Sequence, residues 1–388
     1  MLTRTVRGTF KMTSTLQKIS TILFLLLGFS SYAQKTSFNV FEAIQEPDSI
    51  EFLRISCPHH FSDKYPCDTV PKEISSLKRL KTISATESRF CCLPTTFNQL
   101  DSLETFSLSE NQNFQINELC KLVGLPRLKT LRLSFMNISE LPNCVGRIQS
   151  LENVWLNLYG LNYTQAIQVL SELPNLESLY FNLEEDQSFP ENVQLLDNLL
   201  YLRLDYSFLD IQDLIKYCSI MNLKGLSLAE ISLNQLPQDF SEMSSLAGLD
   251  LSGNSFDSLP NEILKLENLR FLSLRDNYHH FDFFLGDEIS RLKQLEYLDL
   301  SDTRINQLPD GITKLNKLRF LNIHRSKVSN LTSVIPKIKG LEHLNVDLNK
   351  VNTEEIEKLR ELCPDLKITN LMIGQLENSD IITEMMKK

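Results

Sequence analysis

One six-residue pattern, Leu-x-x-Leu-x-Leu with other apolar residues allowed at its second and third apolar places, recurs through most of the chain. Alternate apolar residues place one face of a short strand against a core, but a single unit cannot bury that face alone. Neighbouring units must therefore stack, which predicts one elongated repeat array. The first Leu of each unit is Leu80, Leu103, Leu128, Leu151, Leu176, Leu199, Leu223, Leu246, Leu269, Leu295, Leu318 or Leu341.

The second half of each unit is as informative as the first. In the unit that begins at Leu246, the strand pattern ends at Asn254, and Leu259-Pro260 then opens a segment containing Ile263 and Leu266. Proline ends extended pairing and suits the start of a helical or irregular return, whose apolar residues cover the other side of the core.

These units resemble the leucine-rich repeat family, in its form of about 23 residues with a Leu-Pro-x-x-Ile-x-x-Leu second half. The resemblance extends over residues 50–371. It implies an α/β solenoid shaped as a curved horseshoe, with a parallel β-sheet on its concave face and short helices or irregular turns on its convex face. The family also places an Asn after the strand, whose amide satisfies backbone groups between coils. Asn111, Asn254, Asn277 and Asn349 occupy that place.

Four segments follow from this division. Residues 1–33 are predicted to be a signal peptide, and residues 34–79 an N-terminal cap with a degenerate first repeat. Residues 80–365 hold the twelve repeats, and residues 366–388 a C-terminal cap and tail. The units beginning at Leu128, Leu151 and Leu176 depart most from the pattern, so we expect less regular turns there.

The signal-peptide prediction rests on the order of residue types. Four basic residues and no acidic residue precede an 11-residue apolar run over residues 19–29. Ser31 and Ala33, which follow this run, are the small residues that a cleavage site requires. That run is too short to span a bilayer, so we expect no membrane span. Cleavage near Ala33 would make the protein extracytoplasmic, whether periplasmic, on the cell surface or secreted. Met1 and Met12 remain alternative starts.

Charge and motifs exclude several functions. Lys and Arg number 39 against 49 Asp and Glu, a formal net charge of −10, and an acidic chain does not favour binding to nucleic acid. The sequence has no Gly-rich phosphate loop, no His-Glu-x-x-His and no Gly-x-Ser-x-Gly motif. We therefore predict a protein that is not an enzyme and uses no cofactor.

The eight cysteines offer disulfides in an oxidising compartment. Cys57 and Cys67 bracket an insertion, and we predict that they bridge. Cys120, Cys218 and Cys363 lie in return segments and are interpreted as buried core thiols. One of the adjacent pair Cys91 and Cys92 should be exposed or bridged. The residues around Cys57 lack paired metal-ligand spacing, so no metal site is expected.

The strands expose a definite set of positions. With the first Leu of a unit as position one, positions three, five, seven and eight should face the concave side. Position seven holds Thr86, Ser109, Ser134, Asn157, Asn182, Asp205, Ala229, Ser252, Arg275, Ser301, His324 and Asp347.

At position five, the middle of the array carries Arg132, Trp155, Tyr180 and Arg203 in consecutive units. Trp, Tyr and Arg supply most of the binding energy at protein interfaces. The alternative is that aromatic neighbours only stabilise the sheet. The predicted ligand-binding residues are Arg132, Phe135, Trp155, Tyr180, Tyr201, Arg203, Asp205 and Tyr206, and a secondary patch at position three holds Phe271, Tyr297, Phe320 and His343.

We therefore predict a monomeric, non-enzymatic recognition module that binds a protein or peptide on its concave face, with a glycan as the alternative ligand. Two other functions remain open at this point. The chain could be a structural or adhesive surface protein, or an intracellular signalling scaffold if the signal peptide is not cleaved.

Overall fold

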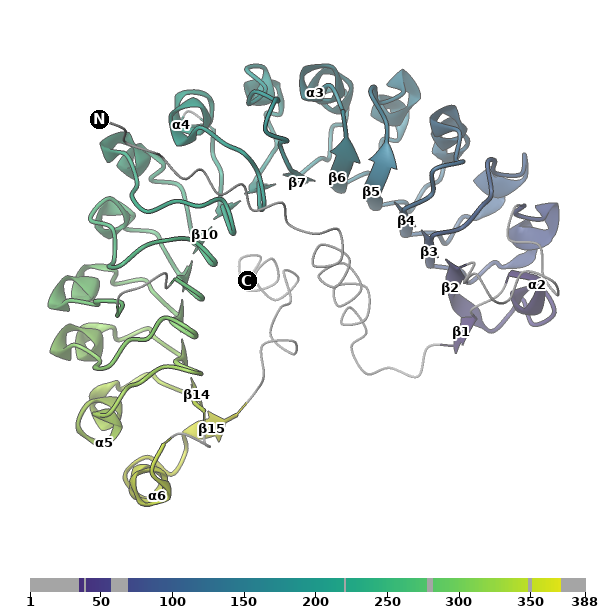
Figure 1. Ribbon diagram of the computed structural model, residues 1–388. Helices are drawn as coiled ribbons and strands as arrows, with labels where there is room; N and C mark the ends of the chain where they lie inside the picture. Colours follow the sequence, from purple (N-terminus) through teal and green to yellow (C-terminus); the bar gives the residue numbers. More distant parts are fainter. Residues whose placement is uncertain are drawn as a thin grey trace, which may run out of the picture.

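The computed structural model describes residues 35–37, 40–56, 69–219, 221–277, 282–347 and 351–370. These residues form one parallel 15-stranded sheet in which the order of the strands in space is their order in the sequence. Figure 1 shows the result as an arc, with the strands along its inner side and the helices along its outer side. The predicted solenoid, with a concave parallel sheet and short convex helices, is confirmed.

The strands are short, and the longest lie in the first half of the arc. Those of the first half are β1 (Lys35–Ser37), β2 (Ile50–Ser56), β3 (Thr82–Thr86), β4 (Thr105–Ser109), β5 (Thr130–Asn137), β6 (Asn153–Tyr159), β7 (Ser178–Phe181) and β8 (Tyr201–Arg203). Those of the second half are β9 (Gly225–Ser227), β10 (Gly248–Asp250), β11 (Phe271–Ser273), β12 (Tyr297–Asp299), β13 (Phe320–Asn322), β14 (His343–Asn345) and β15 (Lys367–Thr369).

The convex side is built mostly from 3-10 helices. The α-helices are α2 (Val40–Ala43), α3 (Tyr163–Leu170), α4 (Ile211–Cys218), α5 (Leu331–Val334) and α6 (Thr353–Leu362). The 3-10 helices are η1 (Lys72–Ser76), η2 (Phe97–Gln99), η3 (Ile116–Leu122), η4 (Asn143–Arg147), η5 (Val193–Leu195), η6 (Gln238–Glu242), η7 (Ile263–Lys265), η8 (Asp287–Arg291), η9 (Asp310–Lys314) and η10 (Ile335–Lys337).

Local sequence explains where these helices begin. Pro71, Pro142, Pro237 and Pro309 hold extended backbone immediately before η1, η4, η6 and η9, which is the role predicted for the Pro of the repeat. The longer helices α3 and α4 have side-chain caps instead. Asn162 accepts a hydrogen bond from the backbone N–H of Gln165, and Asp210 accepts one from that of Gln212.

The core is a single cluster that runs the length of the arc between the sheet and the helices. Apart from Leu341, the first Leu of every unit is at most 2 % exposed. In β3, Ile83 and Ala85 are buried, while Thr82, Ser84 and Thr86 are half-buried and face the concave side. Alternate residues of the repeat pattern therefore lie on opposite faces of the sheet, with the apolar ones toward the core.

Three of the predicted Asn residues connect successive coils. The Asn254 amide donates to the backbone carbonyls of Leu228 and Leu251 at 2.8 and 2.9 Å, and Asn277 and Asn111 make equivalent contacts. All three are at most 1 % exposed, and Asn349 lies outside the described residues. Where the pattern breaks, at Met136, the register between β5 and β6 shifts, as expected for that unit.

Position eight, which comes directly before the place of this Asn, has a positive φ in many units, including units in which another residue replaces the Asn. The angle is 56° at Glu110 and 64° at Gly253, but also 55° at Phe135 and 58° at Tyr206. The left-handed region favours Gly, and a bulky aromatic residue rarely occupies it. The repeat pattern alone does not predict this conformation.

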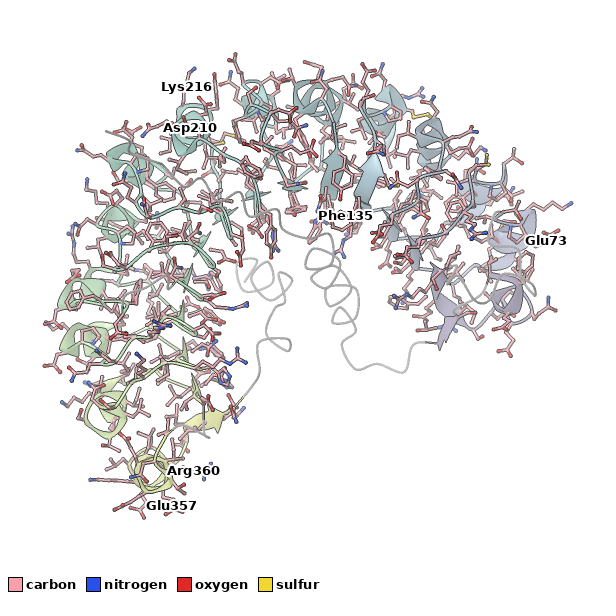
Figure 2. The ribbon with its side chains drawn as sticks, in the orientation of Figure 1. Glu73, Phe135, Asp210, Lys216, Glu357 and Arg360 are labelled. Atoms are coloured by element: carbon pink, nitrogen blue, oxygen red, sulfur yellow. A yellow bond between two sulfur atoms is a disulfide. The ribbon has the colours of Figure 1, made fainter. Side chains whose placement is uncertain are left out.

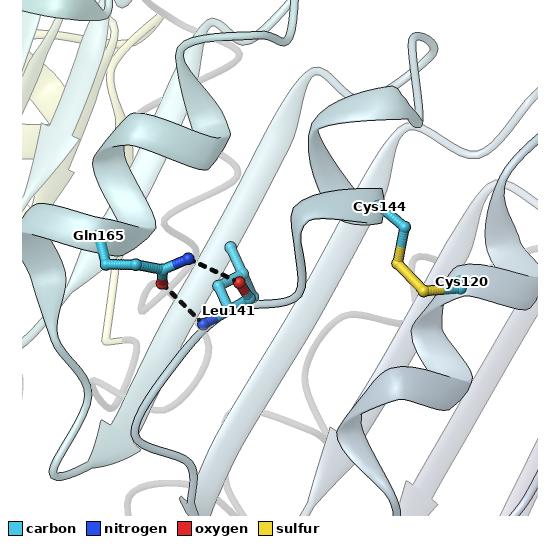
Figure 3. Close-up of a disulfide and its surroundings, with 4 residues drawn as sticks. All are labelled: Cys120, Leu141, Cys144 and Gln165. Carbon is cyan, nitrogen blue, oxygen red and sulfur yellow. Dashed lines mark hydrogen bonds between the residues drawn. A yellow bond between two sulfur atoms is a disulfide. The ribbon is translucent and has the colours of Figure 1, made fainter.

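The cysteines differ from the prediction in one respect. Cys120 is not a core thiol but forms a disulfide with Cys144, with 5.3 Å between their Cα atoms (Figure 3). The two residues are 24 positions apart, about one repeat, and so lie on η3 and η4 of adjacent coils. Cys57 and Cys67 lie outside the described residues.

The other four cysteines of the described residues are unbridged. Cys218 is a buried thiol as predicted, and Cys363 is half-buried. Cys91 and Cys92 are both half-buried and free, although we expected one to be exposed or bridged.

Beside the disulfide, Gln165 of α3 exchanges two 2.9 Å hydrogen bonds with the backbone of Leu141 in the preceding coil (Figure 3). Neighbouring coils are thus joined by side chains as well as by the sheet.

Within the described ranges, no helix has the length and apolar character needed to cross a membrane. The predicted signal peptide, residues 1–33, lies outside those ranges.

Candidate binding face

Strand register brings the four position-five residues together. Arg132 of β5 is aligned with Trp155 of β6, Trp155 with Tyr180 of β7, and Tyr180 with Arg203 of β8. The rings of Trp155 and Tyr180 are 5.0 Å apart. The guanidinium carbon of Arg132 lies 4.6 Å from the Trp155 ring, and that of Arg203 lies 5.6 Å from the Tyr180 ring. We call these four residues the Arg–aromatic row.

The placement of guanidinium groups beside aromatic rings stabilises this row. A guanidinium close to an aromatic ring is attracted by the negative charge of the ring face, and the row has a guanidinium at each end and two rings between them. Tyr180 is 8 % exposed, and burial followed by the nearby Asp205 raises the pKa of its phenol. Tyr180 therefore stays neutral and uncharged at physiological pH.

Asp205 holds the end of the row rather than facing a ligand. It is fully buried, pairs with the Arg203 guanidinium, and accepts hydrogen bonds from the Ser227 hydroxyl at 2.5 Å and the Ala229 N–H at 3.1 Å. Burial by itself would lower the pKa of Arg203, but the Asp205 carboxylate together with Tyr180 and Asp250 outweighs burial and raises that pKa. The sequence predicts Asp205 on the binding surface, whereas the structure makes it the support of Arg203.

Aromatic side chains also gather where strands β5 to β8 end. Phe135 and Tyr159 have ring centroids 6.3 Å apart, and Tyr206 and Phe208 are 39 % and 62 % exposed. Figure 2 shows Phe135 on the inner side of the arc. We call Phe135, Tyr159, Tyr206 and Phe208 the aromatic rim. Phe135 and Tyr206 were predicted, but Tyr159 and Phe208 were missed because they follow the strand pattern, at positions nine and ten.

The secondary patch forms a second aromatic arrangement on β11 to β14. Phe271 and Tyr297 stack at 4.6 Å, Tyr297 and Phe320 at 4.6 Å, and Phe320 approaches His343 at 6.1 Å. Each of the two inner rings is covered on both faces by its neighbours, and Phe271 and Tyr297 are buried. We call these four residues the C-terminal stack.

Beside this stack, position five carries a closed hydrogen-bond network. Asp299 accepts bonds from the Ser301 N–H and hydroxyl at 2.8 and 2.6 Å and from the Asn322 amide at 2.9 Å. Asn322 in turn accepts one from the Asn345 amide at 2.9 Å. Burial raises the pKa of Asp299. These polar groups satisfy one another, so the network stabilises the sheet.

Between the two halves, the carboxylate of Glu230 lies over Gly253. A Cβ atom added at Gly253 would stand 2.4 Å from the Glu230 carboxyl and would displace it, and the φ of 64° at Gly253 also favours Gly. Burial and the neighbouring Asp276 raise the pKa of Glu230 to about 7, with Asp205 and Asp250 adding to the effect and Arg275 opposing it. This edge of the sheet therefore titrates near neutral pH.

The described part of the chain contains no group of three or more His, Cys, Asp and Glu side chains that could hold a metal ion. His59, His60, His279 and His280 lie outside it. The candidate site thus consists of the Arg–aromatic row and the aromatic rim.

Comparison with protein families agrees with this architecture. A family described as a leucine-rich repeat region matches residues 284–387, and the same coil geometry continues from there back to β2. The chain is a leucine-rich repeat protein. Proteins of this kind are generally non-catalytic binding modules that use an extended concave surface.

Solved leucine-rich repeat structures are similar to the chain at low identity. A leucine-rich repeat protein of Leptospira interrogans is 25% identical, with 87% of this chain and 100% of that chain covered and a TM-score of 0.47. An internalin of Listeria monocytogenes is 19% identical over 77% and 83% of the two chains, with a TM-score of 0.48.

A plant example and the curated sequences complete the comparison. The ectodomain of the membrane receptor kinase GASSHO1/SCHENGEN3 of Arabidopsis thaliana, in complex with Casparian strip integrity factor 2, is 20% identical over 83% of this chain and 38% of that chain, with a TM-score of 0.45. No curated protein sequence matches the chain. None of these likenesses assigns a ligand to this leucine-rich repeat protein.

Proposed function

We propose that this leucine-rich repeat protein is a non-enzymatic recognition module that binds a protein or peptide on its concave face. The observation that supports this proposal is the Arg–aromatic row, which joins Trp155, Tyr180 and two Arg side chains on adjacent strands. These residue types bury a large area while keeping a polar handle, and they dominate the energetics of protein interfaces.

The arrangement of the rings favours a polypeptide over a glycan. A sugar ring binds by stacking on an open aromatic face. In the Arg–aromatic row Trp155 has Arg132 against its ring and Tyr180 beside it, and in the C-terminal stack the inner rings cover one another. The parts of the Arg–aromatic row that remain available to a ligand are the ring edges and the guanidinium groups. These suit the carbonyl groups and side chains of a peptide.

The Cys120–Cys144 disulfide supports an extracytoplasmic location. Disulfides persist in oxidising compartments and are rare in the cytosol, so the bridge agrees with the signal peptide proposed for residues 1–33. The intact mass of the protein from its own cells tests this location. A chain that starts at Gln34 and retains a disulfide is expected, whereas a chain that starts at Met1 or Met12 with eight free thiols would favour the intracellular scaffold.

The binding site is tested with the double variant Trp155→Ala/Tyr180→Ala. The probe is a phage-displayed library of linear and disulfide-constrained peptides, selected against the protein expressed from the full chain. We expect the selected peptides to lose at least a hundredfold in affinity for the double variant, about 2.7 kcal/mol. Phe284→Ala is the matched control, because Phe284 is an exposed aromatic residue, 66 % exposed, outside the row and the rim. Unchanged affinity of the double variant would refute the site.

A further inference from the structure

Side-chain polar atoms that are buried without a hydrogen-bond partner gather at one position of the repeat. In the described ranges they include Thr86 Oγ1, Ser109 Oγ, Asn182 Oδ1 and His324 Nδ1. All four residues are at position seven of their units, although their repeats are spread from β3 to β13. Asn192 Oδ1, on the convex side, is a further such atom with no relation to this row.

The four atoms lie in the concave face. Position seven follows the alternation of the strand, so its side chains point away from the core, as the burial pattern of β3 shows for Thr86. Ser109 and His324 are nevertheless each only 3 % exposed. A buried polar atom without a partner costs free energy, and native proteins keep very few of them. The partners of these four atoms therefore come from outside the chain, either as ordered water or as a ligand.

Other position-seven residues show that the position itself does not prevent hydrogen bonding. The Ser301 hydroxyl donates to Asp299 at 2.6 Å, and the Ser252 hydroxyl is 2.7 Å from that of Ser273. These two serines have carboxylates two residues earlier in their own strands, whereas Ser109 follows Ser107 at that place. The unpartnered atoms are thus a property of particular coils.

The chemistry of the missing partner follows from the four side chains at position seven. Thr86, Ser109 and His324 carry groups that can act as donor or acceptor, and Asn182 Oδ1 accepts. Position seven advances along the arc by about 4.8 Å per coil. An extended polypeptide rises about 3.3 Å per residue and directs the N–H and C=O of successive residues to opposite edges, so one edge offers a donor and an acceptor about every 6.6 Å. Such a main chain offers donors and acceptors to these side chains whatever the sequence of the peptide.

We propose that position seven binds the main chain of an extended peptide that runs along the arc, across the strands, while the Arg–aromatic row and the aromatic rim contact its side chains. This inference rests on the proposed function and specifies its ligand. Position seven lies between position five, which carries the row, and positions eight to ten, which carry the rim. The peptide is held along its length by its backbone and selected in the middle by Trp155 and Tyr180.

A stability measurement tests the first half of the proposal without any ligand. Removing an unpartnered buried hydroxyl should stabilise the free protein, so Ser109→Ala is expected to raise Tm by about 1–3 °C. Ser301→Ala is the matched control, the same change at the same repeat position. It removes a made hydrogen bond and is expected to lower Tm. A fall in Tm for both variants would overturn the proposal.

The second half is tested on the phage-selected peptides. N-methylation of single peptide amides keeps the side chains and removes one main-chain donor. We expect about a tenfold loss of affinity at several positions along a bound linear peptide. We expect a similar loss for Ser109→Ala and Thr86→Val, the opposite sign to their effect on stability. Circular dichroism on each variant verifies that the fold is intact.

The outcomes separate this inference from the proposed function. Peptides that depend on Trp155 and Tyr180 but tolerate N-methylation and the position-seven variants would overturn the extended-peptide inference and leave the site standing. The extended-peptide inference also fails if only constrained peptides bind, or if no linear peptide is selected. Linear peptides that depend on position seven but not on Trp155 and Tyr180 would instead refute the site assigned to the row.

Discussion

The two halves of the concave face use aromatic residues in different ways. In the first half, Trp155 and Tyr180 are held between two guanidinium groups, and the nearby rim leaves Phe208 62 % exposed. In the second half, Phe271, Tyr297 and Phe320 stack on one another beside polar side chains that satisfy each other. The sequence predicts both sets as binding patches. The difference between them indicates that the aromatic residues of the first half present a surface, whereas those of the second half mainly stabilise the sheet.

The largest expected difference between the halves concerns the disulfide. Cys120–Cys144 joins the coils behind β4 and β5, and the described part of the second half contains no disulfide. Changing both cysteines to Ser should lower the free energy of unfolding by about 3 kcal/mol, because the bridge closes a loop of about 25 residues. Urea unfolding, followed by Trp155 fluorescence, measures the loss in the first half. An unchanged midpoint would show that the bridge adds no stability.

The next prediction applies one substitution to both halves. Asp205→Asn removes the charge that pairs with Arg203, and we expect a loss of about 2 kcal/mol of stability. Asp299→Asn should cost less than about 1 kcal/mol, because Asn322 and Asn345 already make the equivalent contacts in the next two coils. Equal losses for the two variants, measured by urea unfolding, would contradict the distinction between a carboxyl group paired with a guanidinium and one held by uncharged hydrogen-bond donors.

A change in the C-terminal stack separates stability from binding. Tyr297→Leu removes two ring contacts and keeps most of the volume, so the expected loss of stability is about 1–2 kcal/mol. Peptide affinity should stay within twofold of the parent, in contrast to the hundredfold loss expected for the Trp155→Ala/Tyr180→Ala pair. A large loss of peptide affinity for Tyr297→Leu would mean that the C-terminal stack also contacts the peptide.

The smallest effect concerns pH at the boundary between the halves. The pKa of Glu230 is raised to about 7, so the folded protein holds a proton that the unfolded chain releases near the ordinary value of 4.5. Stability from this group is present at low pH and is lost as pH rises from about 5 through 7. We expect Tm to fall slightly over this window in the parent and less in Glu230→Gln. Identical slopes in the two proteins would exclude Glu230 as the cause.

Repetition made most of the fold predictable. The Leu spacing determined the strands and the register that brings Arg132, Trp155, Tyr180 and Arg203 together, because parallel coils align equivalent positions. Features that depend on one coil meeting its neighbour were harder to predict. The Cys120–Cys144 bridge was missed because each cysteine was considered within its own unit, although two cysteines one repeat apart are a signal for a bridge between adjacent coils.

The sequence predicts which residues form the candidate site, but it does not predict the hydrogen bonds and backbone conformations that hold them in place. The role of Asp205 depends on Ser227 and Ala229 of the next coil, which no pattern within one unit reveals. The left-handed backbone of Phe135 and Tyr206 was missed for a different reason. Position eight is set by the turn that precedes the coil-joining Asn, and the turn accepts residues as different as Glu, Gly and Phe.

The strictly sequential order of the fifteen strands has a mechanical consequence. Each strand pairs only with the strands before and after it in the sequence, so no strand ties one end of the arc to the other. The molecule therefore resembles a spring, in which small rotations between coils add up to a change in the distance between its ends. A ligand laid along the inner side would act as a strut: it would fix the curvature, and pulling its two ends apart would transmit force to every coil in turn.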